Sequence, residues 1–309
     1  MQQDTSSKSA LVSAFLRAYH AENSKVKIFN DSVAKQLLTE DEYRETEIAL
    51  AKSARYFEPN FEGSEKDAVT YVVNKQIGPP ALGRAAFTEE KLELAVQSGA
   101  EQYLILAAGF DSFGYRQPEY AKGIHIFELD HKATSRDKQE RVKRFCPHAI
   151  ENLHYVSVDF TNSKWEEALL AHKNYDKTLI SFCSILGIAY YLSKADFEKL
   201  IWKITQIVAV GSSIVFDYPV QDRADEKESE SIDKQRKLAK EVNETMLAEY
   251  SFSEMEELLQ KYGFCIKEHL VGEQITNIFF SAYNKTEPKY PIIASKGINY
   301  CYAQLEKKR

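Results

Sequence analysis

Gly109, Glu128 and Asp130 have residue types and spacing suited to binding a nucleoside. Gly109 ends the short apolar run of residues 101–109, and the two acids end a second apolar run at FELD. They follow Gly109 by 19 and 21 residues. This is about the separation expected between a glycine turn and a carboxylate that binds ribose hydroxyls. The pattern predicts one strand–turn–helix–strand unit with a nucleoside site.

The glycine motif itself is incomplete. A GxGxxG sequence would place glycine at position 107, where this chain has Ala107. An ordinary tight turn also explains AxGxxG, and the acidic strand end alone does not choose between a nicotinamide cofactor and S-adenosylmethionine. The cofactor therefore stays open at this point.

The elements around these residues predict an α/β fold. Apolar runs typical of buried parallel strands alternate with helical stretches, which predicts a parallel sheet with helices on both faces. The expected strands are residues 101–109, 124–129, 153–158, 178–186 and 212–218, followed by a late pair at FCIKEHL and TNIFFSAYN.

The rest of the chain divides around that sheet. We expect an N-terminal helical cap at residues 1–99, a Rossmann-like domain at 100–284 and a C-terminal tail at 285–309 that either packs or extends freely. Within the domain, the charged segment 219–250 is expected to be a lid over the site or a solvated helix.

Four ordered motifs resemble the leucine carboxyl methyltransferase family, most closely its tetracenomycin-type polyketide O-methyltransferases. LAAGFDSFGYR is similar to the family's LGAGLDTRAYR, and the others are FELDHKATSRDKQERV, VSVDFTNSKWEEAL and GIAYYLSKADFEKLI. The resemblance covers about residues 9–283. It implies a class I methyltransferase fold with a mostly parallel seven-stranded sheet, and S-adenosyl-L-methionine as cofactor.

The resemblance also implies roles for individual residues. Arg84, assisted by Arg17, would pair with the methionine carboxylate, while Gly109 and Asp111 would border the methionine part. Glu128 and Asp130 would hold the ribose, and Asp159 and Phe160 would flank adenine. Each has a structural alternative: an ion pair for the arginines, a turn or helix cap for Asp111 and Asp159, and core packing for Phe160. Family members often carry Glu where this chain has Leu186, which removes an expected polar contact near the methionyl amine.

The methyl acceptor decides which catalytic residues are needed. A carboxylate is already ionised at neutral pH, whereas a phenol gains from a positioned base. Tyr190, Tyr191 and Tyr218 follow the fourth and fifth strands, and Tyr191 is the preferred catalytic candidate. His20 in RAYHAE is a candidate base from the cap, with a structural role as the alternative.

Composition limits the partners. A net charge of −6 offers no long-range attraction to nucleic acid or to an anionic membrane surface. No apolar run is long enough to span a bilayer, and MQQDTSSKSA lacks the apolar core of a signal peptide. The four cysteines form no CxxC pair, so we expect no metal site and a reducing, cytoplasmic setting.

Four functions compete on these observations. The first is O-methylation of a small molecule, such as a polyketide-like or aromatic acid. The second is methylation of a protein's C-terminal leucine carboxylate. A nicotinamide-dependent oxidoreductase is disfavoured because no Tyr-xxx-Lys pair follows the fourth strand. A non-catalytic nucleoside-binding relative remains because of Leu186. The oligomeric state stays open.

Overall fold

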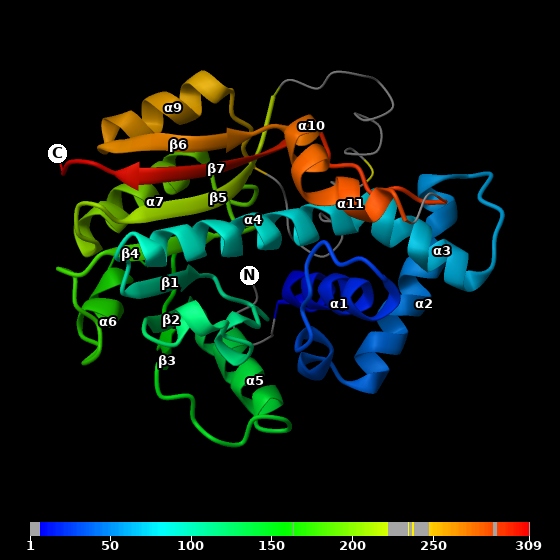
Figure 1. The fold of residues 1–309 in the computed structure, drawn as a ribbon, viewed down its shortest axis with the longest axis horizontal. Helices are drawn as coiled ribbons and strands as arrows, with labels where there is room; N and C mark the ends of the chain where they lie inside the picture. Colours follow the sequence, from blue (N-terminus) through cyan, green and yellow to red (C-terminus); the bar gives the residue numbers. More distant parts are fainter. Residues whose placement is uncertain are drawn as a thin grey trace.

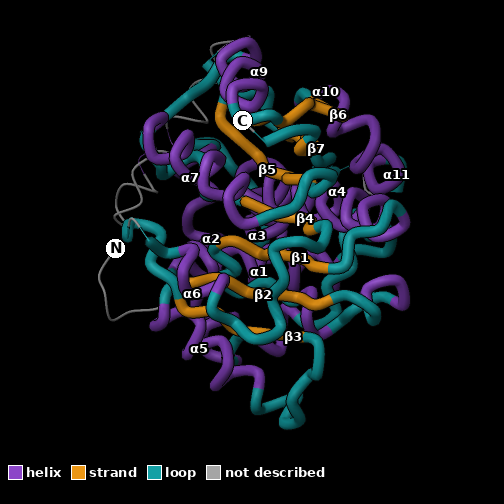
Figure 2. The backbone as a smooth tube through the Cα atoms, turned by 90° about the vertical axis from the view of Figure 1, so that its left-hand side faces the viewer, coloured by secondary structure: helices purple, strands orange, loops and turns teal. Residues whose placement is uncertain are grey.

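The computed structural model describes residues 7–162, 164–221, 247–286 and 289–308, together with Lys234 and Lys237. Seven strands form one sheet in the order β3-β2-β1-β4-β5-β7-β6. Strands β1 to β5 are mutually parallel where they pair, and β7 is antiparallel to both β5 and β6. Figure 2 shows these strands stacked between helices, with β6 and β3 at opposite ends of the sheet. The predicted mostly parallel α/β fold is confirmed.

Strands β1 to β6 match expected runs closely, whereas β7 was not expected. They are β1 (Gln102–Leu106), β2 (His125–Asp130), β3 (Leu153–Ser157), β4 (Ser181–Ile185), β5 (Ser213–Pro219), β6 (Phe264–Leu270) and β7 (Ile298–Leu305). The longer helices are α1 (Lys8–Asn23), α2 (Glu40–Phe57), α3 (Glu65–Val72), α4 (Gly78–Gln97), α5 (Lys132–Val142), α7 (Lys194–Ile207) and α9 (Phe252–Lys261). Shorter ones are α6 (Glu166–Leu170), α10 (Gly272–Ile275) and α11 (Ser281–Asn284).

Local sequence explains where the N-terminal helices begin. Thr39 caps α2 and Ser64 caps α3, and in each case an acid three residues later, Glu42 or Asp67, completes a capping box. Glu42 also accepts two hydrogen bonds from the Arg141 guanidinium at 2.6 and 2.7 Å. This bidentate pair fastens α2 to α5, the helix that follows β2.

Two buried clusters cover the two faces of the sheet. Alternate strand residues such as Leu106, Leu129 and Phe216 pack with α7 and α9, whereas Ile105, Ile126 and Val215 pack with α4. Figure 1 shows α4 lying along its face and reaching the α1–α3 bundle. By strand alternation, Glu128, Asp130 and Asp217 point toward the α4 face.

Two predictions near the C-terminus are wrong. TNIFFSAYN is not a strand: residues 276–280 form a π-helical turn that continues into α11. Its apolar run is explained by Phe280 and Tyr283, which bury against the α4 face while Ile278 stays 53% exposed. The segment 285–309 is not a tail either, because β7 lies between β5 and β6 and completes the sheet.

The predicted lid lies mostly outside the described residues. Of residues 219–250, the structure describes 219–221, 234, 237 and 247–250. Its two ends are tied together, since Val220 and Tyr250 form a parallel bridge directly after β5. The segment therefore departs from and returns to the carboxyl end of β5.

A strained residue at the glycine turn generates the first prediction. Ala107 has a φ of +52°, the one positive value for a non-glycine residue within the described ranges. Relief of this strain should outweigh the extra chain entropy of glycine, so Ala107→Gly should raise the free energy of unfolding by about 0.5–1 kcal/mol. Urea unfolding followed by fluorescence measures this.

Ala108→Gly is the matched control. Ala108 is 7% exposed and its φ is not positive, so its replacement should lower the free energy of unfolding by about 1 kcal/mol. Equal loss of stability in both variants would contradict the assignment of strain to Ala107.

Candidate active site at the carboxyl ends of the strands

The turn after β1 is held to the tip of β2. Gly109, with a φ of +52°, donates its backbone N–H to Asp130 Oδ2. Asp111 Oδ1 accepts the Phe113 N–H at 2.8 Å, which closes the turn on its far side. Asp111 therefore takes part in the turn, as the structural alternative for it expected, and its contact with the cofactor stays a prediction. Gly109 and Asp130 lie together.

The two acids of β2 differ in their surroundings. Asp130 accepts two backbone donors, from Gly109 and from His131 at 2.6 Å, and is 8% exposed. A carboxylate has about four lone-pair sites, so Asp130 can accept further hydroxyl donors. Glu128 lies deeper, 2% exposed, with Oε2 at 2.6 Å from the Lys138 ammonium. Of the two, Asp130 is the acid that remains available at the strand end.

Glu128 is nonetheless electrostatically unusual. Its Oε1 is buried and has no hydrogen-bond partner among the described residues. Burial raises the pKa of Glu128 to about 7, although Lys138 lowers it. The Glu128–Lys138 pair joins β2 to α5. The ribose contact predicted for Glu128 stays a prediction, and Glu128 is the less exposed of the two acids.

Arg17 anchors the N-terminal helix to the glycine turn. Its guanidinium donates to Asp31 Oδ2 at 2.8 Å, to Ser13 Oγ at 2.9 Å and to the Phe110 carbonyl at 2.6 Å. Burial would raise the pKa of Asp31, but Arg17 and Arg116 hold it below its usual value. All three guanidinium nitrogens of Arg17 therefore already donate hydrogen bonds within the chain. We interpret Arg17 as a residue that positions the turn.

Arg84 lies at the ends of β4 and β5. Its Nη1 is 3.2 Å from Asp217 Oδ2, and its side chain is 20% exposed. Asp217 is fully buried and also accepts the Gly187 N–H at 2.7 Å and the Tyr190 hydroxyl at 2.8 Å. Sequence reasoning predicted Arg84 but missed Asp217, whose only sequence signal is a lone acid in the apolar run SSIVFDY.

The parallel register brings these groups to one edge. Leu106 pairs with Leu129 and with Ile185, and Ile185 pairs with Phe216. The residues that come next after these pairs therefore lie at one edge: the glycine turn after β1, Asp130 at the end of β2, Gly187 after β4 and Asp217 near the end of β5. Ligands bind at this edge in open parallel α/β sheets.

Asp159 and Phe160 follow β3 at the same edge. Asp159 is exposed, and its Oδ1 accepts both the backbone N–H (2.9 Å) and the hydroxyl (2.6 Å) of Thr161. It closes a turn and does not cap α6, whose N-cap is Trp165. Phe160 is partly buried against Trp165, with ring centroids 5.0 Å apart.

The three tyrosine candidates differ in their burial and in the face of the sheet on which they lie. Tyr190 is buried and its hydroxyl is bonded to Asp217, whereas Tyr191 is partly exposed directly beside it. Tyr218 has the opposite strand parity, packs in the α9-side cluster and bonds His269 Nε2 at 2.8 Å. Tyr191 remains the candidate closest to the strand ends with an accessible side chain.

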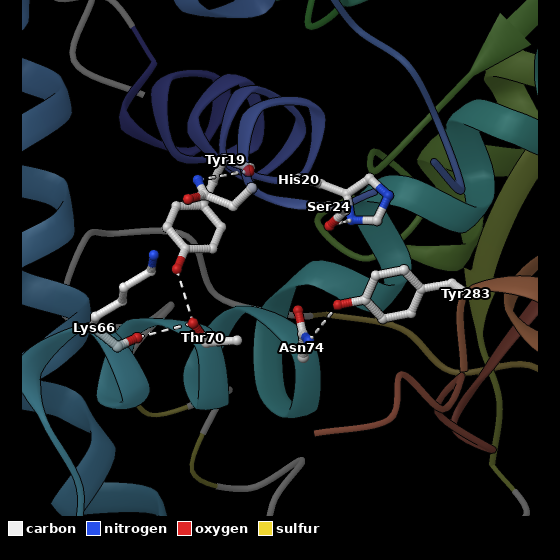
Figure 3. A pocket seen from close by; sticks show the side chains of 8 residues that line it. Tyr19, His20, Ser24, Lys66, Thr70, Asn74 and Tyr283 are labelled. Atoms are coloured by element: carbon white, nitrogen blue, oxygen red, sulfur yellow. Dashed lines mark hydrogen bonds between the residues drawn. The ribbon is translucent and has the colours of Figure 1, made fainter. Parts of the chain in front are cut away.

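His20 lies in a separate polar hollow of about 240 Å³ (Figure 3). Its Nε2 accepts the Ile28 N–H at 2.9 Å, and its Nδ1 is 3.1 Å from Ser24 Oγ. Burial lowers its pKa to about 4. Both ring nitrogens are engaged within the chain and the hollow is lined from helices α1, α3 and α11 and their ends, so we do not retain His20 as a base.

The residues at the strand edge fit an adenosine with a charged amino-acid tail. Asp130 offers acceptors for ribose hydroxyls, and Arg84 offers unused donors for a carboxylate. Gly187 provides the necessary close approach, since a Cβ there would lie 2.6 Å from Arg84 Nη1. Within the described ranges, we find no group of three or more His, Cys, Asp or Glu side chains that could hold a metal. No described helix is long and apolar enough to cross a membrane.

Comparison with known proteins identifies relatives of this chain. The sequence profile described as leucine carboxyl methyltransferase matches residues 10–205. YktD of Bacillus subtilis, which carries the name of an S-adenosyl-L-methionine-dependent methyltransferase, is 33% identical over 286 residues, covering 91% of this chain and 93% of its own.

Solved structures agree in fold. A DUF574 family protein from Streptomyces avermitilis superposes with a TM-score of 0.57 at 13% identity, over 82% of this chain and 96% of its own. A protein from Thermobifida fusca described as a methyltransferase gives 0.55 at 14% identity, over 84% and 95%.

The raised pKa of Glu128 predicts a pH-dependent stability. Between its ordinary value near 4.5 and about 7, the folded state binds more protons at this site than the unfolded state. This contribution to stability is therefore lost as pH rises through that window. Replacing Glu128 with Gln should remove this contribution, so that the free energy of unfolding falls less, or rises more, between pH 5 and pH 7.5 than it does in the wild type when urea unfolding is compared.

Glu101→Gln is the control, because Glu101 is exposed just before β1. It should keep the wild-type slope. If the Glu128→Gln variant also kept it, Glu128 would not be the group that titrates.

Proposed function

The chain belongs to the leucine carboxyl methyltransferase family, and from this we propose that it transfers a methyl group from S-adenosyl-L-methionine to a carboxylate or hydroxyl oxygen of a small molecule. Its class as an S-adenosylmethionine-dependent methyltransferase follows from the family. The acceptor is our proposal. The observation that carries the placement of the site is Asp130 bonded to the Gly109 turn at the edge shared with Arg84.

We assign the cofactor contacts to side chains whose hydrogen-bonding groups are not all used within the described chain. Asp130 would accept the ribose hydroxyls, Arg84 would pair with the methionine carboxylate, and Asp159 with Phe160 would border adenine. Gly109 and Asp111 would shape the wall beside the methionine part. Arg17 would hold the glycine turn, and Glu128 would hold the carboxyl end of β2 against α5.

The chemistry asks little of the protein beyond alignment and exclusion of water. When bound, the cofactor supplies a methyl group on a sulfonium whose departure needs no acid. A carboxylate acceptor needs no base, and Tyr191 would orient the acceptor from the end of β4. A small acceptor is supported by the resemblance to polyketide O-methyltransferases.

Cofactor binding gives the direct test of the site. Calorimetry should detect S-adenosylhomocysteine binding to the wild type, and Asp130→Ala should weaken it by about 1–3 kcal/mol through lost charge-assisted hydrogen bonds. Glu101→Gln is the matched acid-to-neutral control and should bind normally. Unchanged affinity in Asp130→Ala would remove Asp130 from the site, and heat with nicotinamide nucleotides instead would overturn the proposal.

A labelled-methyl transfer screen tests the acceptor. Small carboxylic acids and phenols should be methylated, and Tyr191→Phe should lower the turnover of the preferred acceptor by roughly tenfold, about 1.4 kcal/mol of barrier. Transfer only to peptides ending in leucine would instead identify a protein carboxyl methyltransferase.

A further inference from the structure

Asp217 is a fully buried carboxylate that gathers three groups at the ends of β4 and β5. Its Oδ1 accepts the Gly187 N–H at 2.7 Å, and its Oδ2 accepts the Tyr190 hydroxyl at 2.8 Å and Arg84 Nη1 at 3.2 Å. Ile185 pairs with Phe216, so Leu186 and Asp217 are the next positions on neighbouring strands. The negative charge at the ends of these two strands therefore comes from Asp217 on β5, because Leu186 beside it is apolar.

The same contacts fix the plane and direction of Arg84. The turn at Gly187 has a φ of +68°, and a side chain there would collide with the guanidinium, at 2.6 Å from Nη1. Arg84 is thus held between the Gly187 backbone and the Asp217 carboxylate. Among the described residues, Asp217 is its one hydrogen-bond acceptor, which leaves most of its five N–H donors for a ligand.

We infer that Asp217 is a positioning residue for the cofactor: it presents the free edge of Arg84 to the methionine carboxylate and locks the Gly187 turn beneath it. The inference rests on the cofactor site proposed above. It adds Asp217 as the residue that orients the side chains around the methionine part of the cofactor.

Comparison with Arg17 supports this assignment. Both arginines are largely buried and both pair with a buried aspartate, but Arg17 spends three hydrogen bonds within the chain. Arg84 donates one hydrogen bond within the described chain, and its side chain is 20% exposed. Burying a charge pair is a poor way to gain stability, since desolvation offsets the attraction. A ligand carboxylate that accepts the remaining N–H groups of Arg84 explains better why this charged pair is buried.

The test compares two ligands that share the adenosine and differ in the amino-acid tail. S-adenosylhomocysteine carries the carboxylate, and 5′-methylthioadenosine lacks it. Calorimetry should show that the wild type prefers S-adenosylhomocysteine. In Asp217→Asn, the affinity for S-adenosylhomocysteine should fall by about 10- to 100-fold, while the affinity for 5′-methylthioadenosine stays within about twofold.

Tyr190→Phe is the matched control, because it removes a neutral donor from Asp217 and leaves the Arg84 pair. It should keep the wild-type preference between the two ligands. Asp217→Glu, which restores the charge, should recover part of the preference. An equal loss for both ligands in Asp217→Asn would overturn the inference and leave Asp217 a structural residue.

A second variant covers the case in which Asp217→Asn does not fold. Arg84→Met combined with Asp217→Asn leaves no unpaired buried charge and should bind both ligands equally. A preserved preference in this double variant would overturn the inference. Wild-type protein that binds neither ligand would defeat the proposed cofactor site itself, whereas wild type that binds both equally would defeat only the role of Arg84 and Asp217.

Discussion

The hydrogen bond from the Gly109 amide to Asp130 is the contact on which the site depends. It joins the tips of β1 and β2, and it exists because the parallel register places Leu106 opposite Leu129 and lets both strands end at one edge. An amide bonded to a carboxylate fixes the turn while leaving lone pairs of that carboxylate available. The same edge continues through Gly187 to Asp217, so the register of β1, β4 and β5 sets the distance between the two ends of the proposed cofactor site.

Three buried acids near the proposed site are paired with different cations. Glu128 is paired with Lys138, Asp31 with Arg17 and Arg116, and Asp217 with Arg84. The first pair is buried and joins the carboxyl end of β2 to α5, and the second is buried and holds the N-terminal helix against the turn. The third pair lies at the carboxyl ends of β4 and β5, and most N–H groups of Arg84 have no acceptor within the described chain. Asp130 has no cation among its hydrogen-bond partners in the described chain, which suits a group that must accept ligand hydroxyls.

Much of the fold was predictable from hydrophobic runs and turns, because five buried parallel strands leave short apolar segments that end in glycine or acid. The C-terminal part was not. TNIFFSAYN has the composition of a strand but buries Phe280 and Tyr283 at helical spacing, and β7 is separated from its partner β5 by about eighty residues of chain. Local sequence does not record such long-range antiparallel pairing.

The site was partly predictable for the same reason. Gly109 and Asp130 stand out because a strand end and a turn occur at a fixed spacing. The different roles of Glu128, Arg17 and His20 depend on burial and on partners far away in sequence, such as Lys138 for Glu128 and Phe110 for Arg17. Asp217 went unnoticed because a single acid in an apolar strand reveals nothing until Arg84 is seen beside it.

A crystal structure of the complex with S-adenosylhomocysteine tests the central claim most directly. The account predicts ribose hydroxyls on Asp130, the amino-acid carboxylate on Arg84 and the sulfur beside the Gly109 turn. Density for the ligand at another edge of the sheet, or a ribose that contacts neither Asp130 nor the turn, would contradict it.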